Sequence, residues 1–360
     1  MRSSAHLNVD SPITKCWAWW LCLFVCFSYS PTFGQVVPKP VNCAEVAFDP
    51  ARWRQEGVSL EMFAWEGQHV TLLTKSADLD SDKAAAFLKQ LDAAWKTYLD
   101  LVGKPPQMFR QVDGKPTICA LPKPNLSCGY GCGYVGATGI EVAGFYDQDW
   151  PAFEKDPKAF AHYYFYEMGR NFYVFEDRHS LFTTGYAVFM RYVCMDATRS
   201  TDADIATRAT IERCEQVYAD STIPFLDAFT NLTTGEKGHR LKDAVTLQPI
   251  IPSDQPVMYA SAMLKLRKDY GGDEWTKKFL HYLHECPSIP ANNEKTALQQ
   301  SLNWLVCASA AAGKDLSPVF VGRWRMPLTE EQLSIMKATQ WDRPALSIVK
   351  VIQSLSTSAE

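Results

Sequence analysis

The sequence lacks the patterns that carry the commonest hydrolytic and nucleotide-dependent chemistry. Its 360 residues contain no G-x-S-x-G motif of serine hydrolases, and no glycine-rich phosphate loop that ends in Lys-Ser or Lys-Thr. No run of basic residues occurs, the pI is about 6.0 and the formal net charge is −4, so no nucleic-acid partner is expected. Hydrophobic residues make up 47% of the chain, which predicts a globular protein.

The N-terminus has the pattern of a secretory signal peptide. Lys15 precedes an apolar run at 16–28 that is too short for a comfortable membrane span, and Thr32 and Gly34 suit a cleavage site. An uncleaved signal anchor is the alternative. We therefore predict a secreted, extracellular or periplasmic protein, with residues 1–34 as the signal peptide and no membrane partner after cleavage.

Eight cysteines remain beyond this leader. An even number in an exported chain predicts up to four disulfides, whose pairing the sequence leaves open. A metal site in CGYGC, at 128–132, is disfavoured because the spacing is wrong for a zinc knuckle and no second pair follows. The disulfide candidates are Cys43, Cys119, Cys128, Cys132, Cys194, Cys214, Cys286 and Cys307.

Hydrophobic periodicity predicts an α+β chain with a mixed N-terminal sheet lobe and a helical C-terminal lobe. Residues 61–74 alternate like a strand, residues 80–106 have helical spacing, and 107–121 and 128–146 are typical of strand pairs. Helices are predicted within 158–175 and at 183–197, 202–218, 255–270, 273–285, 294–312 and 329–338. The predicted organisation is an irregular segment at 35–60, the N-lobe at 61–199, the C-lobe at 200–345 and a C-terminal tail at 346–360.

Three segments resemble those of secreted zinc metallopeptidases. YEMGRNF, at 166–172, is similar to a zinc-binding helix, and LFTTGYAVFM, at 181–190, is similar to the helix that supplies a third ligand. AAGKDLSPVFVGRWRMPLT, at 311–329, resembles a segment near the end of such domains. The layout from 61 to 330 is similar to that of the gluzincin branch, especially its enhancin-like and mucin-degrading members, and to plant-type basic secretory proteins. This resemblance implies a disulfide-stapled, zincin-like metallopeptidase fold.

The resemblance also identifies what the chain has lost. The two positions of the zinc-binding histidines are Tyr166 and Arg170, and the position of the ligand carboxylate is Thr184. Only Glu167, the would-be general base, is retained. Because a guanidinium is permanently charged, Arg170 cannot bind a cation, and it is spaced to pair with Glu167 at i+3. We therefore expect no zinc and no other cofactor at this site.

Three functions are compatible with these residues. The first is a secreted, non-catalytic pseudopeptidase, or pseudoenzyme, that binds a peptide or glycan in the old cleft. The second is an active secreted hydrolase whose metal site has moved to His162, Glu167 and His179. The third is a structural envelope protein. The sequence leaves the oligomeric state open.

Overall fold

A computed structural model of the chain describes residues 36–175, 180–201, 205–230, 255–287, 289, 293–343 and 346–358. The predicted signal peptide at 1–34 and the candidate His179 lie outside the described residues. Among the described residues, no helix combines the length and the apolar character needed to cross a membrane.

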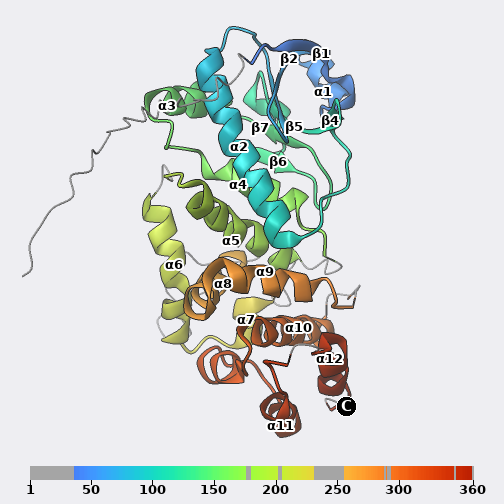
Figure 1. The fold of residues 1–360 in the computed structure, drawn as a ribbon, viewed down its shortest axis with the longest axis vertical. Helices are drawn as coiled ribbons and strands as arrows, with labels where there is room; N and C mark the ends of the chain where they lie inside the picture. The colour runs from blue at the N-terminus through green and yellow to red at the C-terminus, as the bar shows by residue number, and fades with distance from the viewer. Residues whose placement is uncertain are drawn as a thin grey trace, which may run out of the picture. The chain divides into compact units, whose positions relative to one another are not determined.

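The N-terminal part contains a mixed sheet of seven strands (Figure 1). Its order is β1-β2-β3-β5-β7-β6, and β4 pairs with β5. β3, β5 and β7 run parallel, whereas β6 is antiparallel to β7 and ends the sheet. The bounds are β1 Lys39–Asn42, β2 Glu61–Glu66, β3 Thr71–Thr74, β4 Gln111–Val112, β5 Lys115–Ala120, β6 Gly131–Gly133 and β7 Ile140–Val142.

Two of the predicted β segments are hairpins. Asp113 and Gly114 both have positive φ, as a two-residue hairpin turn between β4 and β5 requires, and this confirms the turn predicted there. Residues 61–74, predicted as one strand, form β2 and β3 instead. The connection is held by Asp92, whose carboxylate accepts hydrogen bonds from the backbone N–H groups of Gln68, His69 and Val70.

One face of the sheet packs against α2, Ser81–Val102, which begins after Asp80 and ends at Gly103 with φ +74° as the sequence predicted. The opposite face is covered by the 3₁₀ helix η1, Cys43–Glu45, and by α1, Pro50–Gln55. The prediction of an irregular segment at 35–60 is therefore wrong. This opposite face of the sheet is apolar, and it is shielded from water by side chains of these segments, among them the fully buried Trp53 of α1.

The described residues that follow the sheet are mostly helical, as predicted, and α5 packs against both α4 and α8. The bounds are α3 Trp150–Lys155, α4 His162–Asn171, α5 Ser180–Thr198, α6 Ile205–Ala219, α7 Phe225–Phe229, α8 Gln255–Tyr270, α9 Gly272–Leu283, α10 Glu294–Ala312, α11 Glu330–Ala338 and α12 Ile348–Thr357. Short 3₁₀ or π turns are η2 Pro124–Leu126, η3 Phe145–Asp149 and η4 Pro318–Arg323.

The predicted C-terminal tail is also more ordered than expected. Residues 348–357 form α12, which buries Ile348, Ile352 and Leu355 and packs against α10 and α11. The three apolar residues recur at helical spacing, so one face of the segment is apolar and is buried against its neighbours. Gln332 on α11 donates a hydrogen bond to the carbonyl of Leu355 at 2.8 Å.

Candidate functional site

The helix α4, which carries most of the segment YEMGRNF, lies between the edge strand β6 and helix α5. Gly169 allows the close approach to α5, because a Cβ there would lie 3.1 Å from the Cα of Ala187. It would also meet the Tyr98 hydroxyl, which donates to the carbonyl of Phe165 at 2.7 Å. These contacts position the face of α4 that carries the candidate residues.

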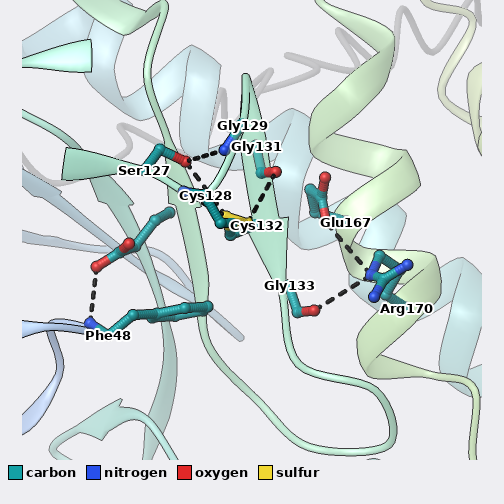
Figure 2. Close-up of a disulfide and its surroundings, with 10 residues drawn as sticks. Phe48, Ser127, Cys128, Gly129, Gly131, Cys132, Gly133, Glu167 and Arg170 are labelled. Carbon is teal, nitrogen blue, oxygen red and sulfur yellow. Dashed lines mark hydrogen bonds and ion pairs between the residues drawn. A yellow bond between two sulfur atoms is a disulfide. The ribbon is translucent and has the colours of Figure 1, made fainter. Parts of the chain in front are cut away.

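Glu167 points from α4 toward strand β6 and is only 5% exposed (Figure 2). Glycine at two alternate strand positions makes this possible. A Cβ at Gly131 would lie 2.9 Å from Oε1 of Glu167, and one at Gly133 would lie 3.0 Å from Oε2. The backbone of β6 therefore covers both carboxylate oxygens.

Arg170 connects the same helix to the edge of the sheet. Its Nε donates a hydrogen bond to the carbonyl of Gly133 at 3.2 Å and lies 3.8 Å from Oε2 of Glu167 (Figure 2). The predicted i, i+3 ion pair is thus confirmed. Tyr166 lies close enough to interact with both charged groups.

The Gly133 carbonyl, which accepts the hydrogen bond from Arg170, belongs to β6, the last strand of the sheet. The side of β6 that faces away from β7 is the open edge of the sheet. The carbonyl of Tyr130 accepts from Ala143 N at 2.9 Å, and Tyr134 N donates to Gly139 O at 3.4 Å, so these residues face β7 and its flanks. Because the backbone groups of a strand alternate in direction, those of Gly131 and Gly133 face away from β7. Arg170 thus occupies a position on the edge that another strand would otherwise pair with.

The hairpin after β6 is tied to the C-terminal end of α4. The side-chain amide of Asn171 donates to the carbonyls of Tyr134 and Gly139, at 2.9 and 3.2 Å. Gly136 N donates to the carbonyl of Arg170 at 3.0 Å. The space between the edge strand and α4 is therefore bridged repeatedly by the chain's own hydrogen bonds.

Burial dominates the electrostatics of the site. It raises the pKa of Glu167 from the ordinary 4.5 to about 7, although the charge of Arg170 and the backbone of Gly133 oppose this rise. Oε2 has no hydrogen-bond partner within the described residues. Burial also raises the pKa of Tyr166, so its phenol is neutral near neutral pH.

These residues do not fit a zinc ion. Zinc takes imidazole, thiolate or carboxylate ligands, whereas the two helix positions hold a neutral phenol and a guanidinium. The guanidinium of Arg170 already interacts with Glu167 and Gly133. Thr184 is half-buried on α5 and has no ionisable group. In the part of the chain that the structure describes, no group of three or more His, Cys, Asp or Glu residues is placed to hold a metal.

The other histidine candidate lies at the far end of α4. His162 is its first residue, and it interacts electrostatically with Asp149. It lies five positions before Glu167 in the helix, which places the two side chains about 140° apart around the axis. The structure therefore does not direct His162 and Glu167 toward a common point.

Two buried carboxyl groups near the site were not predicted as site residues. Asp149 is buried and accepts hydrogen bonds from Tyr163 and Tyr164, and its burial raises its pKa to about 6. Glu141 on β7 accepts from Phe48 N at 2.8 Å, and burial raises its pKa to about 7. No local pattern marks them, because their burial depends on segments distant in sequence. The alternate glycines of GCG, at 131–133, were the available signal of a close backbone approach.

The structure pairs some of the predicted cysteines. Cys128 and Cys132 form a disulfide beside the edge strand (Figure 2). The sulfurs of Cys286 and Cys307 lie 3.3 Å apart, and Cys43 and Cys119 interact within one buried apolar cluster. Cys194 interacts with Tyr98. Cys214 is buried. In the described residues the structure therefore holds one disulfide of the up to four predicted.

The fold is similar to that of solved structures, although no family model and no curated protein matches the sequence. A functionally unknown conserved protein from Bacillus anthracis str. Ames matches with a TM-score of 0.50 and 12% identity, over 79% of this chain and 54% of its own. The M60 catalytic domain of Clostridium perfringens ZmpC, in complex with the sialyl T antigen, matches with a TM-score of 0.47 and 12% identity, over 83% and 53%. The chain thus spans about half the length of these two structures. The similarity to the Bacillus anthracis protein concerns the α+β fold alone.

Proposed function

We propose that this chain is a secreted, zincin-like protein that binds a ligand and does not cut it. The observation that carries the proposal is the contact of Glu167 and Arg170 with Gly133. A general base has to reach a water molecule and the substrate. Glu167 is instead covered by the strand backbone, and a cation that cannot act as a metal ligand lies beside it.

The same contact favours a glycan over an extended peptide as the ligand. A peptide that extends the sheet would pair with the open edge of β6. The Gly133 carbonyl on that edge already accepts a hydrogen bond from Arg170. Such a peptide would have to displace Arg170, which would leave Glu167 buried without its neighbouring charge.

An exposed aromatic ring next to this edge has the features of a sugar contact. Tyr130 directly precedes β6 and is 46% exposed. Its ring packs edge-to-face on Tyr163, with centroids 4.7 Å apart, and its hydroxyl donates to Gln148. The C–H groups of a sugar ring pack well on a fixed aromatic face, and a neighbouring amide can hydrogen-bond its hydroxyls. We propose that the glycan binds over Tyr130.

Zinc content and peptidase activity test the loss of catalysis. The mature protein is compared with the triple variant Tyr166→His, Arg170→His, Thr184→Glu, which restores the three ligand types. We expect substoichiometric zinc and no cleavage in the natural protein, and tight zinc binding in the triple variant. About one equivalent of tightly held zinc in the natural protein would overturn the proposal.

Binding of a matched pair of probes tests the ligand class. The probes are a peptide that carries a mucin-type O-glycan and the same peptide without the sugar. We expect only the glycopeptide to bind, and Tyr130→Ala to weaken its affinity by at least about fivefold, since stacking on an aromatic ring contributes about 1 kcal/mol or more. Phe109→Ala is the matched control, because Phe109 is also an exposed aromatic residue, at 49%. Equal binding of both probes would favour a peptide site.

The hydrolase alternative has one observation in its favour. The pKa of Glu167, raised to about 7, lies where a general base works well. Glu167→Gln separates the two functions. If the natural protein cleaves a peptide or glycoside bond and this variant does not, Glu167 is a catalytic base and the non-catalytic proposal is wrong.

A further inference from the structure

Two pairs of buried cysteines face each other at separate places in the fold. Cys286 follows α9 and Cys307 lies within α10, and their sulfurs are 3.3 Å apart. Cys43 begins η1 and Cys119 lies in β5, and both side chains belong to the same buried apolar cluster, where they interact. All four side chains are at most 8% exposed. Each pair joins elements that are distant along the chain or separated by a loop.

We propose that Cys43 forms a disulfide with Cys119 and that Cys286 forms one with Cys307 in the exported protein. Packing alone accounts poorly for two such pairs. A single buried cysteine packs like a small apolar side chain and needs no second thiol, as Cys194 illustrates by its contact with Tyr98. Small exported domains commonly use such bonds, and the Cys128–Cys132 disulfide is already present.

Each bond would link two packed elements of the structure covalently, one pair at the sheet and one pair in the helical part. The Cys43–Cys119 bond would link η1 to β5 within the apolar cluster that lies between η1, α1 and the sheet and contains Trp53. In this cluster the sulfur of Cys119 also lies 3.8 Å from that of Met62. The Cys286–Cys307 bond would tie the end of α9 to the middle of α10, helices that pack against each other. Neither bond involves residues of the Glu167 site, so this inference rests on the secretion part of the proposed function and not on ligand binding or the loss of catalysis.

Each bond forms by thiol–disulfide exchange with a small-molecule disulfide such as oxidised glutathione. One cysteine thiolate attacks that oxidant and releases one thiol, and its partner then attacks the mixed disulfide and releases the second. The pair loses two protons and two electrons, and the oxidant takes them up and is reduced to two thiols. The interaction with Cys43, together with burial, raises the pKa of Cys119 well above the ordinary value, and burial does the same for Cys307, so little thiolate is present once the chain has folded. The bonds therefore close during folding in the oxidising compartment.

Peptide mapping of the full chain, produced in an oxidising compartment, tests the pairing. The unfolded, unreduced protein is alkylated, digested and analysed by mass spectrometry. We expect cross-linked peptides that join Cys43 to Cys119 and Cys286 to Cys307, each lost on reduction, and an alkylated Cys194. Alkylation of all four paired residues, or cross-links between other partners, would overturn the proposal.

Two variants sharpen the result. Cys307→Ser should make Cys286 available to alkylation and leave the Cys43–Cys119 cross-link intact. Cys194→Ala is the matched control, and it should leave both cross-links unchanged. If Cys307→Ser does not fold, the map of the natural protein decides the question without it.

Discussion

Replacement of Glu167 by Gln gives the sharpest test of the buried carboxylate. The pKa of Glu167 rises from 4.5 to about 7 on folding, because burial outweighs the opposing charge of Arg170. Between these two values the folded protein therefore binds more protons than the unfolded chain. The free energy of unfolding must then fall as the pH rises from about 4.5 to about 7.

The size of this fall follows from the difference between the two pKa values. It corresponds to about 3 kcal/mol at 25 °C, all of it lost above about pH 7. Glutamine has nearly the same shape as the protonated acid and does not titrate. We therefore expect Glu167→Gln to match the natural protein near pH 4.5 and to be more stable by about 3 kcal/mol near pH 8.

Urea unfolding followed by tryptophan fluorescence, from about pH 4.5 to about pH 8, measures the difference. Asp149 and Glu141 also have raised pKa values, about 6 and about 7, but both proteins contain them and their effects cancel in the comparison. Glu154→Gln, on the surface at the end of α3, is the matched control for the amide. If the curve of Glu167→Gln runs parallel to that of the natural protein, Glu167 is not buried as described.

Three further substitutions test the packing around the site. Asn171→Ala removes both amide hydrogen bonds to the hairpin carbonyls and should cost about 1 to 3 kcal/mol in unfolding free energy, with faster hydrogen exchange in the hairpin. Gly133→Ala should destabilise by about 1 to 3 kcal/mol in the same unfolding assay, since its Cβ would lie 2.7 Å from the carbonyl oxygen of Glu167. Gly322→Ala, where a Cβ meets nothing within 4 Å, is its control, and an equal loss there would contradict the reasoning. Leu355→Ala should cost about 2 to 5 kcal/mol if α12 is part of the core, and a loss below about 0.5 kcal/mol would show that it is not.

The elements that were predicted correctly are those whose signals are local. α2 has an Asp cap, helical spacing and a closing glycine within one stretch, and the β4–β5 turn is an Asp-Gly pair. The pairing of Glu167 with Arg170 also follows from spacing alone, because residues three apart on a helix are neighbours. Such features depend on residues close in sequence, so one sequence is enough to find them.

The features that were missed depend on distant segments. α1 and η1 were not predicted. They are stabilised by packing on an apolar sheet face, and the strands that form this face come later in the chain. α12 was taken for a tail, since its apolar stripe has meaning only against α10 and α11. The closure of the site was missed for the same reason. The site is closed by the contact of the β6 glycines with Glu167. These residues are far apart in sequence, and hydrophobic periodicity does not predict contacts over such a separation.

The arrangement around Gly133 shows how the fold accommodates a buried carboxylate at Glu167. A buried carboxylate is stable only with a neighbouring positive charge, with hydrogen bonds or in its protonated form. A metal would supply such a charge in an enzyme, and here Arg170 supplies it from one turn further along the same helix. The guanidinium has donors to spare, so it also satisfies a carbonyl on the edge of the sheet. On this reasoning, Arg170 stabilises the buried glutamate, and under the proposed function its charge stands where a metal's would.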